Sequence, residues 1–123
     1  MEKKYEVVPV SLYKVTVNGT VTYYSQFVEM SDGYAKVMKN GKWGILTPCG
    51  NILGKIEYSE IYDFCDDIAR VVKNGKYGYV DRKREKVITD CIYDKATNFK
   101  YGLADVIINK KKRRINILGK YID

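Results

Sequence analysis

The sequence predicts an all-β protein built as a tandem array of antiparallel β-hairpin repeats of about 34 residues. The first observation is that the eight residues KNGKWGIL at 39–46 return at 73–80 as KNGKYGYV. The second is that Asn-Gly pairs stand between alternating apolar residues, while helical spacing is nowhere sustained. Because one hairpin cannot bury a core alone, neighbouring units must stack, in either a solenoid-like or a barrel-like arrangement.

Each of the two matching segments predicts a hairpin. A type I′ turn needs positive φ at both central residues, and Asn and Gly tolerate that best, so the turns are expected at 40–41 and 74–75. A two-residue loop pairs Lys39 with Lys42 and places Trp43 on the face opposite Val37. A three-residue turn with a glycine bulge would shift this register, and we leave that alternative open.

Residues 1–23 are expected to form a capping hairpin. Residues 15–23 alternate in polarity around a third Asn-Gly pair, Asn18-Gly19. The spacing from this segment to the next unit is shorter than between later units, so we interpret it as a degenerate half-unit. Repeat arrays need such caps because an end unit would otherwise expose a face meant for a neighbour.

Three full repeats follow, at residues 24–56, 58–92 and 93–123, within a single domain of 123 residues. Within each we expect a short strand or turn, a loop, the two hairpin strands, and a polar turn before another short strand. Recurrence at fixed positions indicates that the shared aromatic side chains pack inside the array. The aligned positions are Tyr24, Tyr58 and Tyr93, then Met30, Phe64 and Phe99, then Ala35, Ala69 and Ala104.

The three copies each match part of the pattern F-x-x-G-L-A-x-V-x-K-N-G-K-W-G-Y-I-D. The matching residues are 40–44 in the first copy, 76–81 in the second, and Phe99, Gly102, Leu103, Ala104 and Val106 in the third. This pattern resembles the WG repeat family, also called KWG repeats. The resemblance implies tandem β units, a mostly bacterial origin, no generally assigned catalysis and a role in interactions. The tryptophan that gives the family its name occurs once, as Trp43. Tyr77 and Lys112 take its place in the second and third copies.

The residue inventory argues against catalytic and metal-binding classes. The absence of histidine removes the commonest general base and the commonest zinc ligand. Cys49, Cys65 and Cys91 are odd in number and widely spaced, which fits neither a disulfide framework nor paired metal ligands. No nucleophile elbow or phosphate loop is present. We therefore expect no enzyme activity, no catalytic residue, no metal and no cofactor.

The apolar residues occur in short runs, none of which approaches the roughly 18 consecutive residues that a membrane helix needs. The first ten residues, MEKKYEVVPV, lack the apolar core of a secretory signal. We expect a cytoplasmic protein without membrane contact and leave its oligomeric state open.

The net charge of +7 favours an anionic partner, which clustered cations would bind. The third copy replaces its Asn-Gly turn with Asn109-Lys110 and carries five consecutive cations. This run is either a solvated cap, in which charge replaces an aromatic contact, or a site for phosphate or an acidic protein surface. Lysine-rich hairpin tips would form a row if the hairpins stack, and such a row would either follow a polyanion or remain solvated. The candidate binding residues are Lys39, Lys42, Lys73, Lys76, Lys110, Lys111, Lys112, Arg113 and Arg114.

Acidic residues cluster in the middle of the chain. They lack the spacing of a calcium-binding EF-hand loop, so we expect a solvated loop. These residues are Glu57, Glu60, Asp63, Asp66 and Asp67.

Two functions from different classes follow. The first is a non-enzymatic protein–protein interaction module, such as a small stand-alone bacterial or mobile-element adaptor or inhibitor. The alternative is a nucleic-acid binding protein that uses the basic third repeat and the lysine tips. Lysines outnumber arginines by 17 to 5, which weakens recognition of phosphate by bidentate arginines. Tips scattered over several faces would remove most support for the alternative.

Overall fold

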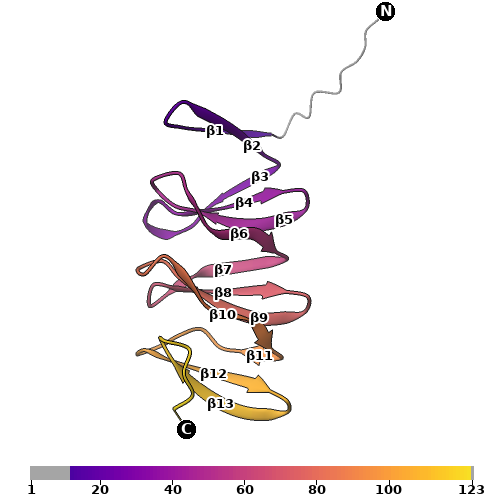
Figure 1. Ribbon diagram of the computed structural model, residues 1–123, viewed down its shortest axis with the longest axis vertical. Helices are drawn as coiled ribbons and strands as arrows, with labels where there is room; N and C mark the ends of the chain where they lie inside the picture. The colour runs from indigo at the N-terminus through magenta and orange to yellow at the C-terminus, as the bar shows by residue number, and fades with distance from the viewer. Residues whose placement is uncertain (1–11, 123) are drawn as a thin grey trace, which may run out of the picture.

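The computed structural model describes residues 12–122, which form four antiparallel sheets (Figure 1). The N-terminal hairpin consists of β1 (Tyr13–Val17) and β2 (Thr20–Tyr24). The first sheet consists of β3 (Gln26–Glu29), β4 (Ala35–Lys39), β5 (Lys42–Leu46) and β6 (Ile52–Tyr58). The second consists of β7 (Glu60–Cys65), β8 (Ile68–Lys73), β9 (Lys76–Asp81) and β10 (Lys86–Tyr93). The third consists of β11 (Lys95–Ala96), β12 (Leu103–Ile108) and β13 (Lys111–Asn116).

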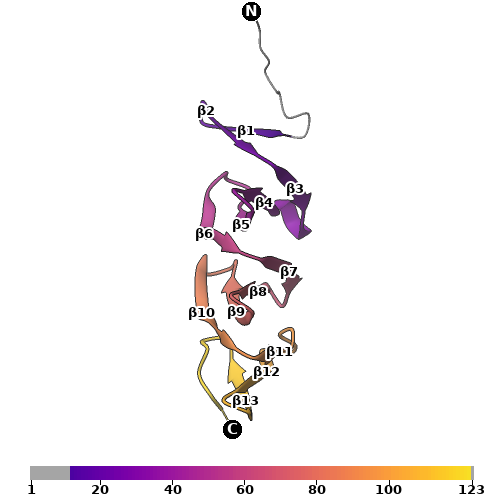
Figure 2. The same ribbon diagram turned by 90° about the vertical axis from the view of Figure 1, so that its right-hand side faces the viewer.

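The sheets follow one another along a column, as Figures 1 and 2 show. The last strand of each unit runs into the first strand of the next with one residue between them, so that β2 leads to β3, β6 to β7 and β10 to β11. The three tyrosines at these passages, Tyr24, Tyr58 and Tyr93, are buried, as expected. The all-β repeat prediction is confirmed, and of the two expected stackings the solenoid-like one is found.

The segment between each of these tyrosines and the next hairpin was only partly predicted. Where we expected a loop before the second hairpin, Phe64 lies in β7 and pairs with Ala69 of β8. The strand continues to Cys65 because β8 supplies hydrogen-bond partners to its backbone. In the first sheet the corresponding segment contains a short 3₁₀ turn, η1 (Ser31–Gly33).

The hairpin register agrees with the two-residue turns. Lys39 lies opposite Lys42, and Lys73 lies opposite Lys76. The turn residues at 40–41 and 74–75 all have positive φ, between 54° and 77°, which excludes the bulged alternative. The turn at Asn18-Gly19 is of the same kind, so the predicted N-terminal hairpin is present; residues 1–11 of the expected cap lie outside the described part of the chain.

The third hairpin forms the same turn with a lysine where the other turns have glycine. Lys110 has a φ of 64°, in the left-handed region that costs a side-chain-bearing residue roughly 1 to 2 kcal/mol. Lys110→Gly is therefore expected to raise the free energy of unfolding by about 0.5 to 1 kcal/mol, since the greater freedom of glycine in the unfolded chain offsets part of the gain. Urea unfolding followed by circular dichroism measures the change.

The matched control for this substitution is Gly75→Lys, at the corresponding position of the second hairpin. It should lower the free energy of unfolding by a similar amount, because Gly75 has a φ of 75°. A loss of stability on Lys110→Gly would contradict the strain argument.

The core is divided into three clusters, each lying between neighbouring units. The cluster between the N-terminal hairpin and the first sheet contains Tyr24, Ala35, Val37 and Leu46. The cluster between the first and second sheets contains Ile45, Leu53, Tyr58, Ile61, Ala69, Val71 and Val80. The cluster between the second and third sheets contains Ile68, Tyr79, Tyr93, Phe99, Ala104, Val106 and Ile115. The hairpins of the first and second sheets therefore each bury one face against the unit before them and the other against the unit after them.

In the first and second sheets, a glycine in the second hairpin strand allows the fourth strand of the sheet to pass close to its backbone. A Cβ added to Gly44 would lie 2.6 Å from Cγ1 of Ile56 in β6, and one added to Gly78 would lie 2.9 Å from the backbone oxygens of Thr89 and Asp90 in β10. The register of both strand pairs shifts near these glycines. Arg113 takes the corresponding place in the third sheet, opposite Val106.

Candidate interaction surface

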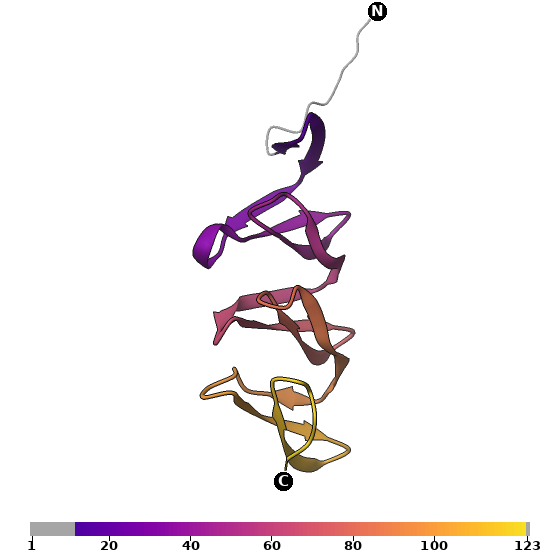
Figure 3. The same cartoon turned by 60° about the vertical axis from the view of Figure 1, so that its left-hand side comes forward.

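The tips of the three repeat hairpins lie on the same side of the column, on the right in Figures 1 and 3. Each tip carries two lysines in or beside its turn. We call this row of tips the basic edge, and its residues are Lys39, Lys42, Lys73, Lys76, Lys110 and Lys111. The turn between β9 and β10, with Lys83 and Lys86, lies on the opposite side of the column (Figure 1).

The three tips differ in how their charge is compensated. In the middle tip, Lys73 Nζ donates to Glu57 Oε1 at 2.7 Å, and Lys76 forms an ion pair with Asp94. Lys39 and Lys42 at the first tip are exposed and form no ion pair with any residue of the range 12–122. The basic edge therefore has uncompensated lysines at the first tip and compensated lysines in the middle.

Strand alternation divides the five-cation run of the third hairpin. Lys110 and Lys111 belong to the tip. Lys112 takes the register position of Trp43, on the face turned away from the second sheet, and is exposed. Arg114 shares that face, and its Nε donates to Asp105 at 3.0 Å.

Arg113 points to the other face of the same strand, and its guanidinium lies 4.0 Å from the centre of the Tyr121 ring. The five cations at 110–114 therefore separate into three groups: two at the hairpin tip, two on the end face of the column, and Arg113 over the ring of Tyr121. It is not a single cluster of five charges.

Cations also link successive sheets. Lys36 Nζ lies 4.7 Å from the centre of the Trp43 ring and donates to Glu60 Oε1 in β7 at 2.9 Å. Arg70 takes the corresponding position in the second sheet and donates to the carbonyl oxygen of Ala96 in β11 at 2.7 Å. Trp43, which is half-buried, thus packs between sheets and not on an open surface.

The prediction of a solvated loop for the carboxylates was wrong for Glu57, Glu60 and Asp63, which lie in strands. Asp66 and Asp67 do form a turn, between β7 and β8, and all five carboxylates have partners within the protein. Sequence reasoning missed Arg82, whose side chain is 14% exposed and pairs with Asp67 at 2.9 Å and Asp32 at 2.7 Å. Its guanidinium also lies 4.6 Å from the centre of the Phe64 ring. The remaining contacts are Glu57 with Lys73, Glu60 with Lys36, Asp63 with Ser31, and Asp66 with the backbone N–H of Gly102.

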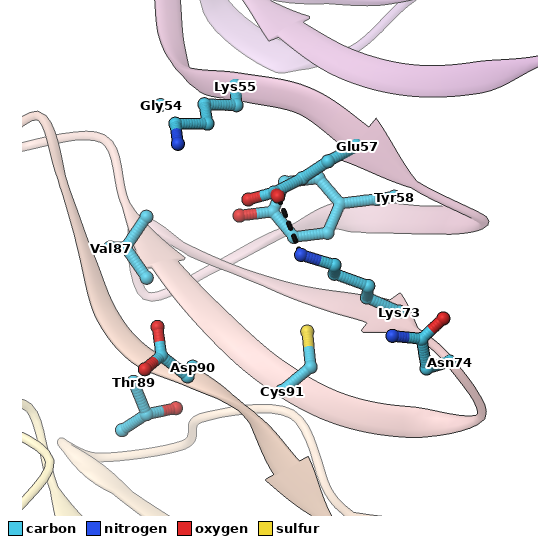
Figure 4. A pocket seen from close by; sticks show the side chains of 10 residues that line it. All are labelled: Gly54, Lys55, Glu57, Tyr58, Lys73, Asn74, Val87, Thr89, Asp90 and Cys91. Atoms are coloured by element: carbon cyan, nitrogen blue, oxygen red, sulfur yellow. Dashed lines mark hydrogen bonds and ion pairs between the residues drawn. The ribbon is translucent and has the colours of Figure 1, made fainter.

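A hollow of about 430 Å³ lies beside the middle tip (Figure 4). Burial, with help from the carboxylates of Glu57 and Asp90, raises the pKa of the Cys91 thiol in this hollow to about 11. Burial also raises the pKa of the Tyr58 hydroxyl. Both groups are therefore protonated at neutral pH, and a protonated thiol is a poor nucleophile.

Cysteine and acidic side chains form no metal cluster in the described residues: no three of them, from 12 to 122, gather closely enough to hold an ion. The three cysteines are unpaired. Within the same range, no helix is long and apolar enough to cross a membrane.

Comparison with known proteins gives one match. A family model described as "WG containing repeat" matches three consecutive segments, residues 23–43, 50–77 and 77–111. No curated protein and no solved structure matches the chain. The matched segments include the strands β4, β8 and β12, which lead into the three tips.

Proposed function

Because the chain belongs to the family of WG-containing repeats, we propose that it is a non-enzymatic interaction module that binds an acidic surface of another protein through the basic edge. The observation that carries this proposal is the repetition of the same hairpin tip on the same side of three successive sheets (Figure 1). A repeat column presents an extended surface to which each unit adds one hairpin tip at the same position. The contact here is a lysine pair.

The chemistry of the edge fits a protein partner. Lysines at exposed tips attract an oppositely charged surface and raise the association rate, without requiring the fork geometry that arginine supplies. We propose that the protein acts in the cytoplasm, where reducing conditions keep its three unpaired cysteines as thiols. More specifically, we propose a small stand-alone adaptor or inhibitor of bacterial or mobile-element origin.

Nucleic-acid binding is the second candidate, and the alignment of the tips is what favours it, because a row of cations can follow a phosphate backbone. Two features weigh against it. The tips carry lysine, asparagine and glycine, so they offer no aromatic ring for stacking bases. The middle tip places the carboxylates of Glu57 and Asp94 beside its lysines.

Reversing charge at the tips tests the proposed function. The variants Lys39→Glu/Lys42→Glu and Lys110→Glu/Lys111→Glu are each expected to weaken capture of the partner at least tenfold, because each replaces attraction with repulsion across the interface. Capture from lysate of the native host, quantified by mass spectrometry, identifies the partner and measures the change. All four lysines are exposed, so the melting temperature should stay close to that of the unmodified protein.

Lys83→Glu/Lys86→Glu is the matched control, with the same change of charge on the opposite side of the column. Capture that survives both tip variants would contradict the proposed function. Anisotropy titration with a short single-stranded DNA at about 50 and about 200 mM salt tests the second candidate, which requires tight binding that falls steeply as salt rises.

A further inference from the structure

The middle tip shows how this protein compensates a pair of opposed lysines. Lys73 and Lys76 face each other across the hairpin, and directly opposed like charges destabilise a strand pair. Each lysine has its own carboxylate, Glu57 at the end of β6 and Asp94 immediately after β10 (Figure 4 shows Lys73 and Glu57). The two acidic residues thus bracket the tip, one from each neighbouring passage between sheets.

The first tip has the same lysine pair without these carboxylates. Lys39 and Lys42 are directly opposed, as Lys73 and Lys76 are. Aligned on the tyrosines at the passages, the positions of Glu57 and Asp94 are taken by Tyr23 and Ser59. In the second sheet, Glu57 and Asp94 offset the repulsion between the two opposed lysines. In the first sheet these two carboxylate positions hold no acid, so carboxylates of a binding partner can offset the repulsion there.

The third tip is a second uncompensated patch. Lys110 and Lys111 are exposed and form no ion pair with a residue of the described chain, and Lys112 follows them on the same strand. The nearby carboxylate of Asp105 is engaged by Arg114. Free cations therefore occur at the two ends of the basic edge, separated by a tip in which positive and negative charges balance.

We propose that the partner contributes an acidic polypeptide segment with two carboxylate clusters, one seated on the first tip and one on the third, joined by a neutral stretch that passes the middle tip. This inference rests on the proposed function and specifies the chemistry of the partner. At the first tip the partner's carboxylates take the positions that Glu57 and Asp94 take at the middle tip.

A phosphate backbone matches this pattern poorly. Duplex DNA carries one negative charge per roughly 1.7 Å of its axis, so its charge has no gap. Lying along the edge, it would bring phosphates against the carboxylates of Glu57 and Asp94. A polypeptide can instead place neutral residues there, because its sequence sets the spacing of its charges.

Synthetic peptides provide the test. Each labelled peptide carries two clusters of four glutamates joined by a Gly-Ser spacer of graded length, and binding to the full chain is measured by anisotropy at about 50 mM salt. Linking two weak contacts strengthens binding most when the spacer matches the distance between the sites. We expect an optimum spacer at which affinity exceeds that of a single glutamate cluster at least tenfold.

Variants assign the two contacts. Lys39→Glu/Lys42→Glu and Lys110→Glu/Lys111→Glu should each reduce the optimum peptide to the affinity of a single cluster, while Lys83→Glu/Lys86→Glu leaves it unchanged. The double variant Glu57→Gln/Asp94→Asn frees the middle lysines and should strengthen binding of short DNA several-fold. Affinity independent of spacer length, or DNA that binds the unmodified chain more tightly than the optimum peptide, would overturn the inference.

The proposed function and this inference can fail separately. If the tip variants lose the native partner but no spaced peptide binds better than a single cluster, the edge is an interface and the two-cluster inference is wrong. If the native partner is retained by both tip variants, the proposed function fails and the inference falls with it.

Discussion

Tyr79→Ala is expected to lower the free energy of unfolding by about 4 kcal/mol, within the range for deletion of a large buried side chain. Tyr79 is fully buried between the second and third sheets. Its ring meets that of Phe99 edge-on, with 4.8 Å between ring centres, and its hydroxyl donates to the carbonyl oxygen of Thr97 at 2.5 Å. Alanine leaves a cavity and an unsatisfied carbonyl at the contact that joins two units.

Chemical denaturation measures the total loss, and amide hydrogen exchange locates it. Because each unit of an array contacts only its neighbours, protection should fall more in the third sheet than in the first. Trp43→Ala is a useful comparison, since Trp43 is only half-buried and should cost about half as much. Equal losses of unfolding free energy for the two variants, or a uniform loss of protection across the column, would contradict the view that each core cluster stabilises only the contact between its own two units.

Gly78→Ala is expected to cost about 2 to 3 kcal/mol, the upper range for forcing an extra carbon into a packed site. The new Cβ would lie 2.9 Å from two backbone oxygens, those of Thr89 and Asp90. Side chains can rotate away from a clash, but backbone oxygens in a strand cannot, so β10 must separate from β9. Denaturation with urea measures the loss of stability.

The control for Gly78→Ala is Arg113→Ala, at the corresponding register position of the third sheet. A Cβ is already accommodated there, so alanine should cost less than half as much as at position 78. If Gly78→Ala is neutral, the closeness of the crossing does not explain the glycine.

The hairpins were predictable because their determinants are local. Asn40-Gly41 and its equivalents select a type I′ turn by their own backbone preferences, and the turn then fixes which residues pair. The strand at β7 was not predictable in the same way, since it depends on pairing with β8 and its sequence shows no clean alternation. The close crossing at Gly78 also depends on a strand that follows later in the chain.

The candidate surface was predictable only in outline. Lysines at recurring turns implied a row once the units stacked, and the structure places the tips on one side. Compensation of Lys73 and Lys76 was missed because Glu57 and Asp94 lie 16 and 18 residues away in the sequence. The division of the run at 110–114 could have been foreseen, since side chains alternate between the faces of a strand.

Arg113 changes what the third sheet presents to a strand that crosses it. In the first two sheets a glycine at this register position lets the fourth strand pass closely, whereas Arg113 carries a side chain there and its guanidinium lies over the Tyr121 ring. A strand that passed β13 as closely as β6 passes Gly44 would meet at least the Cβ of Arg113.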